Sequence, residues 1–296
     1  LLSTEAFYFV VIPLLSWSAA ANAQPAMFVT FFAINIFIGN WLKNFFALSR
    51  PAASGKAGGA AATDFGWPSM HLVNAVGVPF FAMRYWYGGL GSGTSYSDEN
   101  PVATIVSYLC AFLWVALIAT ARLFSGASSP ADVQGGMLVG GVLIRLWLPV
   151  CDTVKEWIVG SDSYFLGFPQ WTVLVFGSLL FLGLHPYTPN DPRSWVAYGY
   201  SCKAVAFAVC VVLGANGAAL YGLNDLMRSQ KELHPASLAL GPVARLLVRN
   251  LVGFVGLAVA WATSRAASGF LEAGVRKAAP NLVCAPKLFR DMVSVA

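Results

Sequence analysis

The stretch AFYFVVIPLLSWSAAANAQPAMFVTFFAINIFIGNWL, residues 6–42, contains no aspartate, glutamate, lysine or arginine. A helix needs about 20 mainly apolar residues to cross a bilayer, so this stretch is long enough for two crossings. Its middle, residues 22–25 (Asn-Ala-Gln-Pro), is polar and ends in a proline, which interrupts a helix. We therefore expect two membrane-spanning helices, at about 6–22 and 26–46.

The composition of the whole chain indicates the same class of protein. Of its 296 residues, 57% are hydrophobic and 10% are charged, whereas soluble domains carry about 25% charged residues. Lipid must therefore solvate much of the surface. We expect a single all-α domain over residues 1–296, a membrane bundle of about eight spans with a basic surface tail at 270–296. The further spans are expected at about 72–87, 102–121, 133–147, 170–187, 197–223 and 246–268.

Counting helices places three polar segments at one membrane surface. The second span ends at residues 43–51, and the glycine- and alanine-rich loop that follows returns to His71 without crossing. The third and fourth spans leave that surface and come back to it, which delivers residues 121–132 to the same face. We therefore expect segments 43–51, 68–71 and 121–132 to meet there, although they are distant in sequence.

Three cations stand in these segments, each at the mouth of an apolar span. Ionisable groups are expensive there, and they indicate a functional site. Lys43 offers a point charge, while Arg50 and Arg122 offer planar guanidinium groups that bind two oxygens at once. Taken alone, each cation could equally be an interfacial anchor whose charge reaches toward water. Their convergence favours a site for a phosphate dianion.

The second segment adds a helix N-terminus and a histidine. Ser69 stands just before an expected helix, so its hydroxyl and the amides of Met70 and His71 can face an anion. His71 titrates near neutrality and can protonate a leaving alkoxide. The predicted phosphate-binding residues are Lys43, Arg50, Ser69, Met70 and Arg122, with His71 as the acid–base group.

The three segments resemble the signature of the type 2 phosphatidic acid phosphatase superfamily. Its pattern is Lys-x6-Arg-Pro, then Pro-Ser-x-His, then Ser-Arg-x5-His-x3-Asp. Asn74, three residues after the histidine, and the number of expected spans are similar to the sphingosine-1-phosphate phosphatase branch. The matching residues are Lys43, Arg50 and Pro51, then Pro68, Ser69 and His71, and finally Arg122 and Asp132.

This resemblance implies a phosphoric monoester hydrolase of the endoplasmic reticulum membrane, acting on sphingosine-1-phosphate or another sphingoid-base 1-phosphate. It implies no metal and no cofactor. The expected partners are the bilayer and a phosphorylated lipid, with no nucleic acid, and the oligomeric state stays open. In the family, the third-segment histidine attacks phosphorus, and the aspartate one helical turn later, here Asp132, orients it.

Position 128 departs from the family pattern, because Ser128 stands where the attacking histidine is expected. A serine becomes a nucleophile only beside a base or a metal. We therefore expect this chain to bind phosphate and to turn it over poorly or not at all. Ser128 is either a deliberate replacement that traps an inactive state or a natural loss, and the intact cations favour the first.

Other interpretations stay open at this point. The same site could belong to a lipid-phosphate binder or transporter without catalysis, which Ser128 would explain. The substrate could instead be phosphatidic acid, a polyprenyl diphosphate or a sugar phosphate, because the sequence does not show the shape of the binding site. The side of the membrane that the site faces is open too. Away from the site, His185 is expected to be an ordinary helix-end histidine.

Overall fold

The computed structural model describes residues 24–50, 64–87, 101–159, 164–165, 167–188 and 190–220, together with Leu251 and Val255. The expected span at 6–22, most of that at 246–268 and the basic tail at 270–296 lie outside the described residues. The helices and strands named below all fall within residues 21–233, which belong to one compact unit of the chain.

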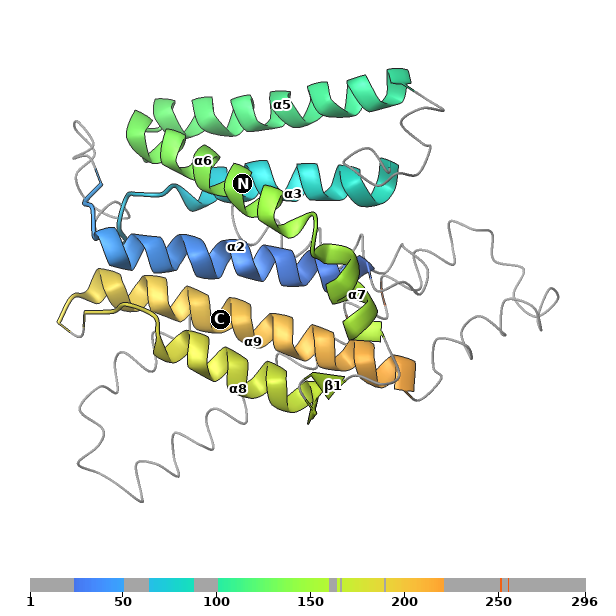
Figure 1. The fold of residues 1–296 in the computed structure, drawn as a ribbon. Helices are drawn as coiled ribbons and strands as arrows, with labels where there is room; N and C mark the ends of the chain where they lie inside the picture. The colour runs from blue at the N-terminus through green and yellow to red at the C-terminus, as the bar shows by residue number, and fades with distance from the viewer. Residues whose placement is uncertain are drawn as a thin grey trace. The chain divides into compact units, whose positions relative to one another are not determined.

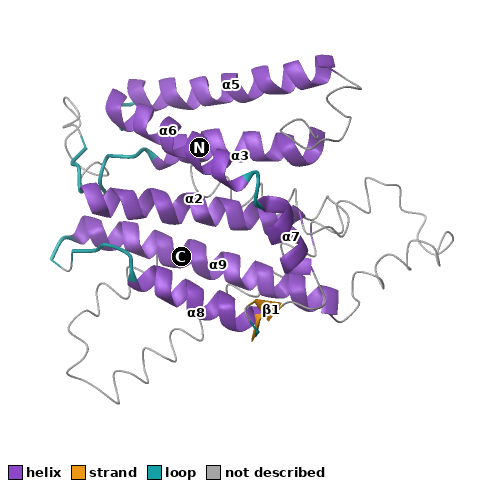
Figure 2. Ribbon diagram, in the orientation of Figure 1, coloured by secondary structure: helices purple, strands orange, loops and turns teal. Residues whose placement is uncertain are grey.

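Seven helices and one short hairpin make up the described part of the chain (Figure 1 and Figure 2). The helices are α2 (Gln24–Phe46), α3 (Met70–Tyr87), α5 (Pro101–Phe124), α6 (Pro130–Trp147), α7 (Cys151–Val159), α8 (Gln170–Gly183) and α9 (Pro192–Leu220), and the strands are β1 (Tyr164–Phe165) and β2 (Phe168–Pro169). Three of the helices begin on a proline, which suits the first helical position because it has no amide hydrogen to satisfy. The all-α prediction is confirmed for this part of the chain.

In the part of the chain that the structure describes, not every expected span forms a helix long enough to cross a membrane. Among the described residues, Ala26–Phe46, Pro101–Phe124 and Pro192–Gly214 are both long and apolar enough. Helices α6 and α7 would together make a fourth span, but they meet at an angle of 61°, and Pro149 lies in the break between them. The prediction of about eight spans is therefore not confirmed.

Residues 151–159, between the expected spans at 133–147 and 170–187, form the helix α7. Their acidic and basic side chains recur at spacings of three and four, which places them on one face of the helix. Cys151 and Ile158, on another face, are buried. The charges are therefore those of an amphipathic helix rather than of a loop.

Glycines let the helices that carry the site approach one another closely. In Figure 1, α2 lies between α3 and α9. A Cβ on Gly136 of α6 would lie 2.6 Å from the carbonyl oxygen of Ser69, and one on Gly140 would lie 2.7 Å from that of Val73. Small residues allow such close backbone contacts between membrane helices. The start of α6 is thereby held against the start of α3.

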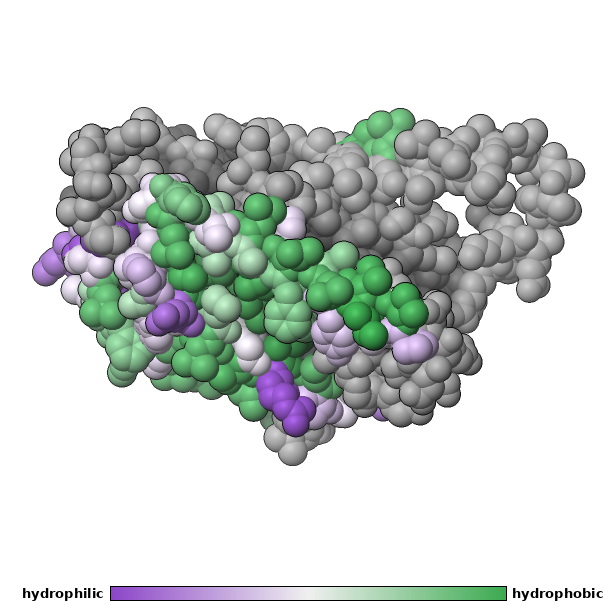
Figure 3. Space-filling view, turned by 90° about the horizontal axis from the view of Figure 1, so that it is seen from above, coloured by the Kyte–Doolittle hydropathy of each residue, from purple (hydrophilic) through white to green (hydrophobic). Residues whose placement is uncertain are grey.

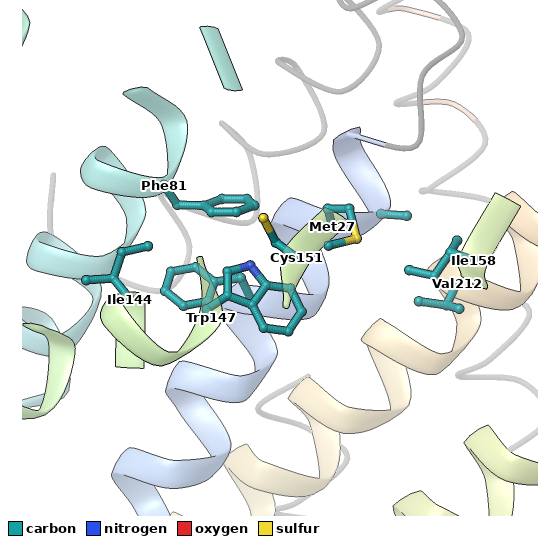
Figure 4. Close-up of a cluster of buried hydrophobic side chains, with 9 residues drawn as sticks. Met27, Phe81, Ile144, Trp147, Cys151, Ile158 and Val212 are labelled. Atoms are coloured by element: carbon teal, nitrogen blue, oxygen red, sulfur yellow. The ribbon is translucent and has the colours of Figure 1, made fainter. Parts of the chain in front are cut away.

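A buried hydrophobic cluster joins α2, α3, α6, α7 and α9 at their other ends (Figure 4). The ring of Phe31 stacks on that of Trp147, with centroids 5.7 Å apart, and lies 5.1 Å from that of Phe81. Such pairs add about 0.5–1.5 kcal/mol each beyond the area they bury. Cys151 and Ile158 of α7 complete the cluster, so the buried face of α7 holds this end of the bundle together.

The outer surface of the bundle is strongly apolar. Figure 3 views the molecule from the α5 side and shows hydrophobic side chains gathered across that face. Contiguous apolar surface of this kind marks a membrane or protein contact, and lipid is the contact expected for a span. The large apolar side chains that α5 exposes are Val102, Ile105, Val106, Leu109, Phe112, Leu113, Leu117, Leu123 and Phe124.

Substituting Gly140→Ala is expected to lower the thermal unfolding midpoint of the purified protein in detergent. The added methyl would meet the backbone of α3, which cannot yield unless the helices separate, and overpacking typically costs about 1–3 kcal/mol. Gly141→Ala is the matched control, because a Cβ there meets nothing within 4 Å. Equal midpoints in the two variants would contradict the close contact between α3 and α6.

Candidate active site

The ends of four helices bring the predicted site residues together. Lys43 lies in the last turn of α2, and Arg50 follows that helix. Arg122 lies in the last turn of α5, while Ser128 directly precedes the cap of α6. Ser69 precedes α3. We call Lys43, Arg50 and Arg122 the cation cluster.

Two backbone hydrogen bonds hold the loop before α3 in place. The amide of Gly66 donates to the carbonyl of Leu48 over 2.8 Å, and the amide of Ser69 donates to that of Asp132 over 3.0 Å. A Cβ on Gly66 would lie 3.1 Å from the nearer carboxylate oxygen of Asp132. Segments 43–51, 68–71 and 121–132 are therefore tied to one another through main-chain contacts.

The two guanidinium groups of the cation cluster converge on one carbonyl. Arg50 Nη1 donates to the carbonyl of Ala127 over 2.7 Å, and Arg122 Nη2 donates to the same oxygen over 3.4 Å. Arg122 also donates to the hydroxyl of Ser128, from Nε over 3.3 Å and from Nη2 over 3.2 Å. Two positive groups this close repel each other, so the arrangement favours an anion beside them.

A carboxylate that the sequence analysis did not select completes the site. Asp64 Oδ2 accepts from both Lys43 Nζ and Arg50 Nη2, the latter over 3.2 Å. The lysine is almost fully buried, with 3% of its side chain exposed. A buried cation needs a partner of opposite charge, and in this structure Asp64 supplies it.

Asp132 is engaged at the start of α6. Its Oδ2 accepts from the amide of Ser129 over 2.7 Å, while its own amide donates to the hydroxyl of Ser129 over 3.1 Å. This reciprocal pair is a capping box. Because α6 begins at Pro130, Ser128 lies outside the helix, and the expected helical turn between Ser128 and Asp132 is wrong.

The start of α3 offers amides and a buried hydroxyl. The carbonyl of Ser69 accepts from the amides of Leu72 and Val73, so the helix begins there, and first-turn amides have no partner within a helix. The Ser69 hydroxyl oxygen is buried without a hydrogen-bond partner in the described part of the chain. The side chain of Met70 packs at Gly39 of α2, so Met70 can bind an anion only through its amide.

The pKa of His71, in the first turn of α3, is lowered by all three members of the cation cluster. Burial, followed by the positive charges of Arg122, Lys43 and Arg50, lowers the pKa of His71 from 6.5 to about 3. The imidazole is therefore neutral at pH 7 when no other anion is bound. A bound dianion would offset the three cations and raise the pKa of His71 from this low value, while burial, the largest cause, would still lower it.

His185 has the structural role expected of it, with a different partner. It follows α8 and is buried, and its Nε2 lies 3.1 Å from the hydroxyl of Ser201 in α9. Its ring packs edge-on against Phe37 and Tyr198. These contacts join α8 to α2 and α9, so His185 belongs to the packing of the helices.

The part of the chain that carries the site matches a known protein family. The profile of the PAP2 superfamily matches residues 25–155, the stretch that contains all the site residues described above. Residues 25–155 are a PAP2 superfamily domain. The family resemblance drawn from the three sequence segments is thereby confirmed.

Curated relatives of this PAP2 domain carry lipid phosphatase names. The chain is 26% identical over 210 residues to "Lipid phosphate phosphatase delta" of Arabidopsis thaliana, covering 69% of this chain and 47% of that protein. It is 26% identical over 207 residues to "Probable sphingosine-1-phosphate phosphatase" of Dictyostelium discoideum, covering 69% and 49% respectively. For "Sphingosine-1-phosphate phosphatase 2" of Mus musculus the identity is 24% over 176 residues, covering 59% and 46%. The chain spans about half the length of these relatives, and no solved structure matches it significantly.

The PAP2 domain contains α2, α3, α5, α6 and the first half of α7, whereas α8 and α9 lie beyond it. Helix α9 nevertheless supports the site. Asn44, beside Lys43 in α2, donates to the carbonyl of Ser194 in α9 over 3.0 Å. Arg193 of α9 lies over the ring of Phe65, 4.8 Å from its centroid, in the loop before α3.

Asp64 is the site residue of the PAP2 domain that sequence reasoning missed. A signal for it existed, because Asp64 is the only acidic residue between Glu5 and Asp98. A lone carboxylate is expected to pair with a cation of the same stretch, which holds Lys43 and Arg50. No sequence motif includes Asp64, however, and its loop has the composition of a glycine- and alanine-rich linker.

Proposed function

We propose that this PAP2 domain binds the phosphate group of a membrane lipid, and that the active form of the site is a lipid-phosphate phosphatase. The observation that carries the proposal is the cation cluster itself, in which two guanidinium groups share the Ala127 carbonyl. Asp64 is the carboxylate that pairs with two of the three cations in the described part of the chain, so the site keeps a net positive charge that favours a further anion. A phosphate dianion fits the helix N-terminus and the planar guanidinium groups together.

The proposed substrate is sphingosine-1-phosphate or another sphingoid-base 1-phosphate, in the endoplasmic reticulum membrane. The names of the Dictyostelium and mouse relatives support this substrate class. The apolar face of α5 supports a place for the lipid tail beside the helices. Phosphatidic acid, polyprenyl diphosphates and sugar phosphates are the rival substrates for the same site.

The site residues divide the proposed reaction among them. A histidine at position 128 would attack phosphorus, and the lipid would leave as an alkoxide that takes a proton from His71. His71 would then accept a proton from water as the water cleaves the phosphohistidine and releases phosphate. Asp132 would orient the nucleophile. The phosphoryl oxygens would be bound by Lys43, Arg50, Arg122, the Ser69 hydroxyl and the amide of Met70.

This chain lacks the attacking imidazole, so we propose that it binds its ligand without turnover. Ser128 is buried, and its hydroxyl oxygen accepts from Arg122. Hydrogen bonds from a cation make a hydroxyl oxygen less nucleophilic. Ser128 equally supports the second candidate, a lipid-phosphate binder or transporter that never performs the reaction.

The phosphate requirement is tested by titrating the purified chain with sphinganine 1-phosphate and with sphinganine. The two lipids share a tail and an amine, and they differ only in the phosphate. We expect binding of the first and at least about tenfold weaker binding of the second, because each charge-assisted hydrogen bond to phosphate contributes about 1.5–3 kcal/mol. Equal affinity for both lipids would refute the phosphate site.

The same titration gives a pH prediction for His71. Its pKa of about 3 in the free site should rise when phosphate binds, so at acidic pH binding takes up a proton on His71 and tightens as the pH falls. Calorimetry in two buffers of different ionisation enthalpy measures this uptake. His71→Asn should take up fewer protons, while His185 and His234 are the same in both proteins. Identical proton uptake would place His71 outside the phosphate site.

A further inference from the structure

The carboxylate of Asp64 already holds two members of the cation cluster. Its Oδ2 accepts from Lys43 Nζ and Arg50 Nη2. Its Oδ1 is buried and has no hydrogen-bond partner in the described part of the chain. Asp64 is therefore half satisfied, with one oxygen bound to the cations and the other oxygen unused.

A phosphate that enters this site competes with Asp64 for the same cations. Lys43 has 3% of its side chain exposed and Asp64 has 19%. Water can therefore solvate little of the Asp64 carboxylate once phosphate has displaced it from the cations. If phosphate takes both cations, the displaced carboxylate lies beside a dianion with no positive partner. Like charges in such a site are strongly unfavourable. A ligand that brings its own cation removes this cost.

We propose that Asp64 selects phosphorylated lipids that carry an ammonium group close to the phosphate ester. This inference rests on the proposed function. Two ion pairs exchange together when such a ligand binds, because the phosphate takes Lys43 and Arg50 and the ammonium takes Asp64. A sphingoid-base 1-phosphate has its amine on the carbon next to the one that bears the phosphate. Phosphatidic acid and polyprenyl diphosphates have no such group, so Asp64 discriminates against them.

The test compares two ligands that differ only at the amine, which is charged in sphinganine 1-phosphate and is an uncharged acetamide in N-acetylsphinganine 1-phosphate. The unmodified chain is expected to bind the free amine about 10- to 150-fold more tightly, the range of one charge-assisted hydrogen bond. In Asp64→Asn this preference should fall to within about threefold, chiefly because the acetylated ligand binds better once the carboxylate is gone. Asp64→Glu should keep the preference. Asp152→Asn, which removes an exposed carboxylate of α7, should behave like the unmodified chain.

Each outcome decides the inference. Equal affinity of the unmodified chain for the two ligands overturns it, whether or not any variant folds. A preference that survives in Asp64→Asn overturns it as well, as does an equal loss of both ligands, which would make Asp64 a support for the loop. If the unmodified chain binds neither ligand, the proposed function itself fails. If both ligands bind but the preference for the free amine is absent or does not depend on Asp64, the proposed function is retained and only the role of Asp64 is refuted.

Discussion

Ser128→His is expected to turn the chain into a phosphomonoesterase that needs no added metal, raising its turnover by up to about 10⁶-fold. Removing the nucleophile from an otherwise assembled site can cost that much, so restoring it should return a comparable factor. Ser128 is buried, and its hydroxyl lies 3.2 Å from Arg122 Nη2. An imidazole at this position would begin beside the cation cluster. Phosphate release from sphinganine 1-phosphate in micelles measures the change.

Two companion variants separate this explanation from a general effect of adding a histidine. Ser125→His places the same residue at an exposed position three residues earlier, and it should remain inactive. Adding His71→Ala to Ser128→His should abolish the activity again, because the leaving alkoxide loses its proton donor. A Ser128→His protein that stays inert on every phosphorylated lipid, while the parent chain binds or moves them, would favour the binder or transporter.

Arg122→Ala is expected to weaken the binding of sphinganine 1-phosphate by roughly 10- to 150-fold, the equivalent of one charge-assisted interaction of about 1.5–3 kcal/mol. The guanidinium reaches both the Ala127 carbonyl and the Ser128 hydroxyl, so its removal takes away a cation and loosens the segment before α6. Arg50→Ala should have a similar effect, because Arg50 shares that carbonyl. Isothermal titration measures both losses.

Arg145→Ala is the matched control for these two variants. Arg145 is exposed in the last turn of α6, at the far end of the helix from Ser128. Its removal takes away the same charge without touching the cation cluster, and binding should be unchanged. Unaltered affinity in both Arg50→Ala and Arg122→Ala would remove the phosphate-site interpretation altogether.

The meeting of the three segments was expected from counting helices, because a pair of helices that leaves a surface and returns to it would deliver Arg122 to the face that holds Lys43. That part of the site was predictable without knowledge of packing. The number of spans was less predictable, because an apolar run such as α8 looks like a span in sequence yet forms a helix of 14 residues. The length of a helix depends on where the backbone turns, and an apolar composition does not show where that is.

Details of the site depended on local contacts that spacing does not determine. The spacing of four between Ser128 and Asp132 suggested one helical turn, but Ser129 caps the N-terminus of α6, so the helix begins after position 128. The sequence Ser129-Pro-Ala-Asp132 has the capping-box pattern, so this signal was present and could have been used. Asp64 is different, because its pairing with Lys43 and Arg50 exists only once the loop has folded back.

The most direct test of the account is to trap the phosphoenzyme in Ser128→His. The variant is incubated with sphinganine 1-phosphate that carries a radiolabelled phosphate, quenched with alkali, and digested to locate the label. We predict a phosphohistidine at residue 128 and at no other position. The label should disappear when Arg122→Ala is added to the variant, and when excess inorganic phosphate competes for the site. Label on another residue, or a protein that binds the lipid and never becomes labelled, would contradict the assignment of this site as a phosphatase centre.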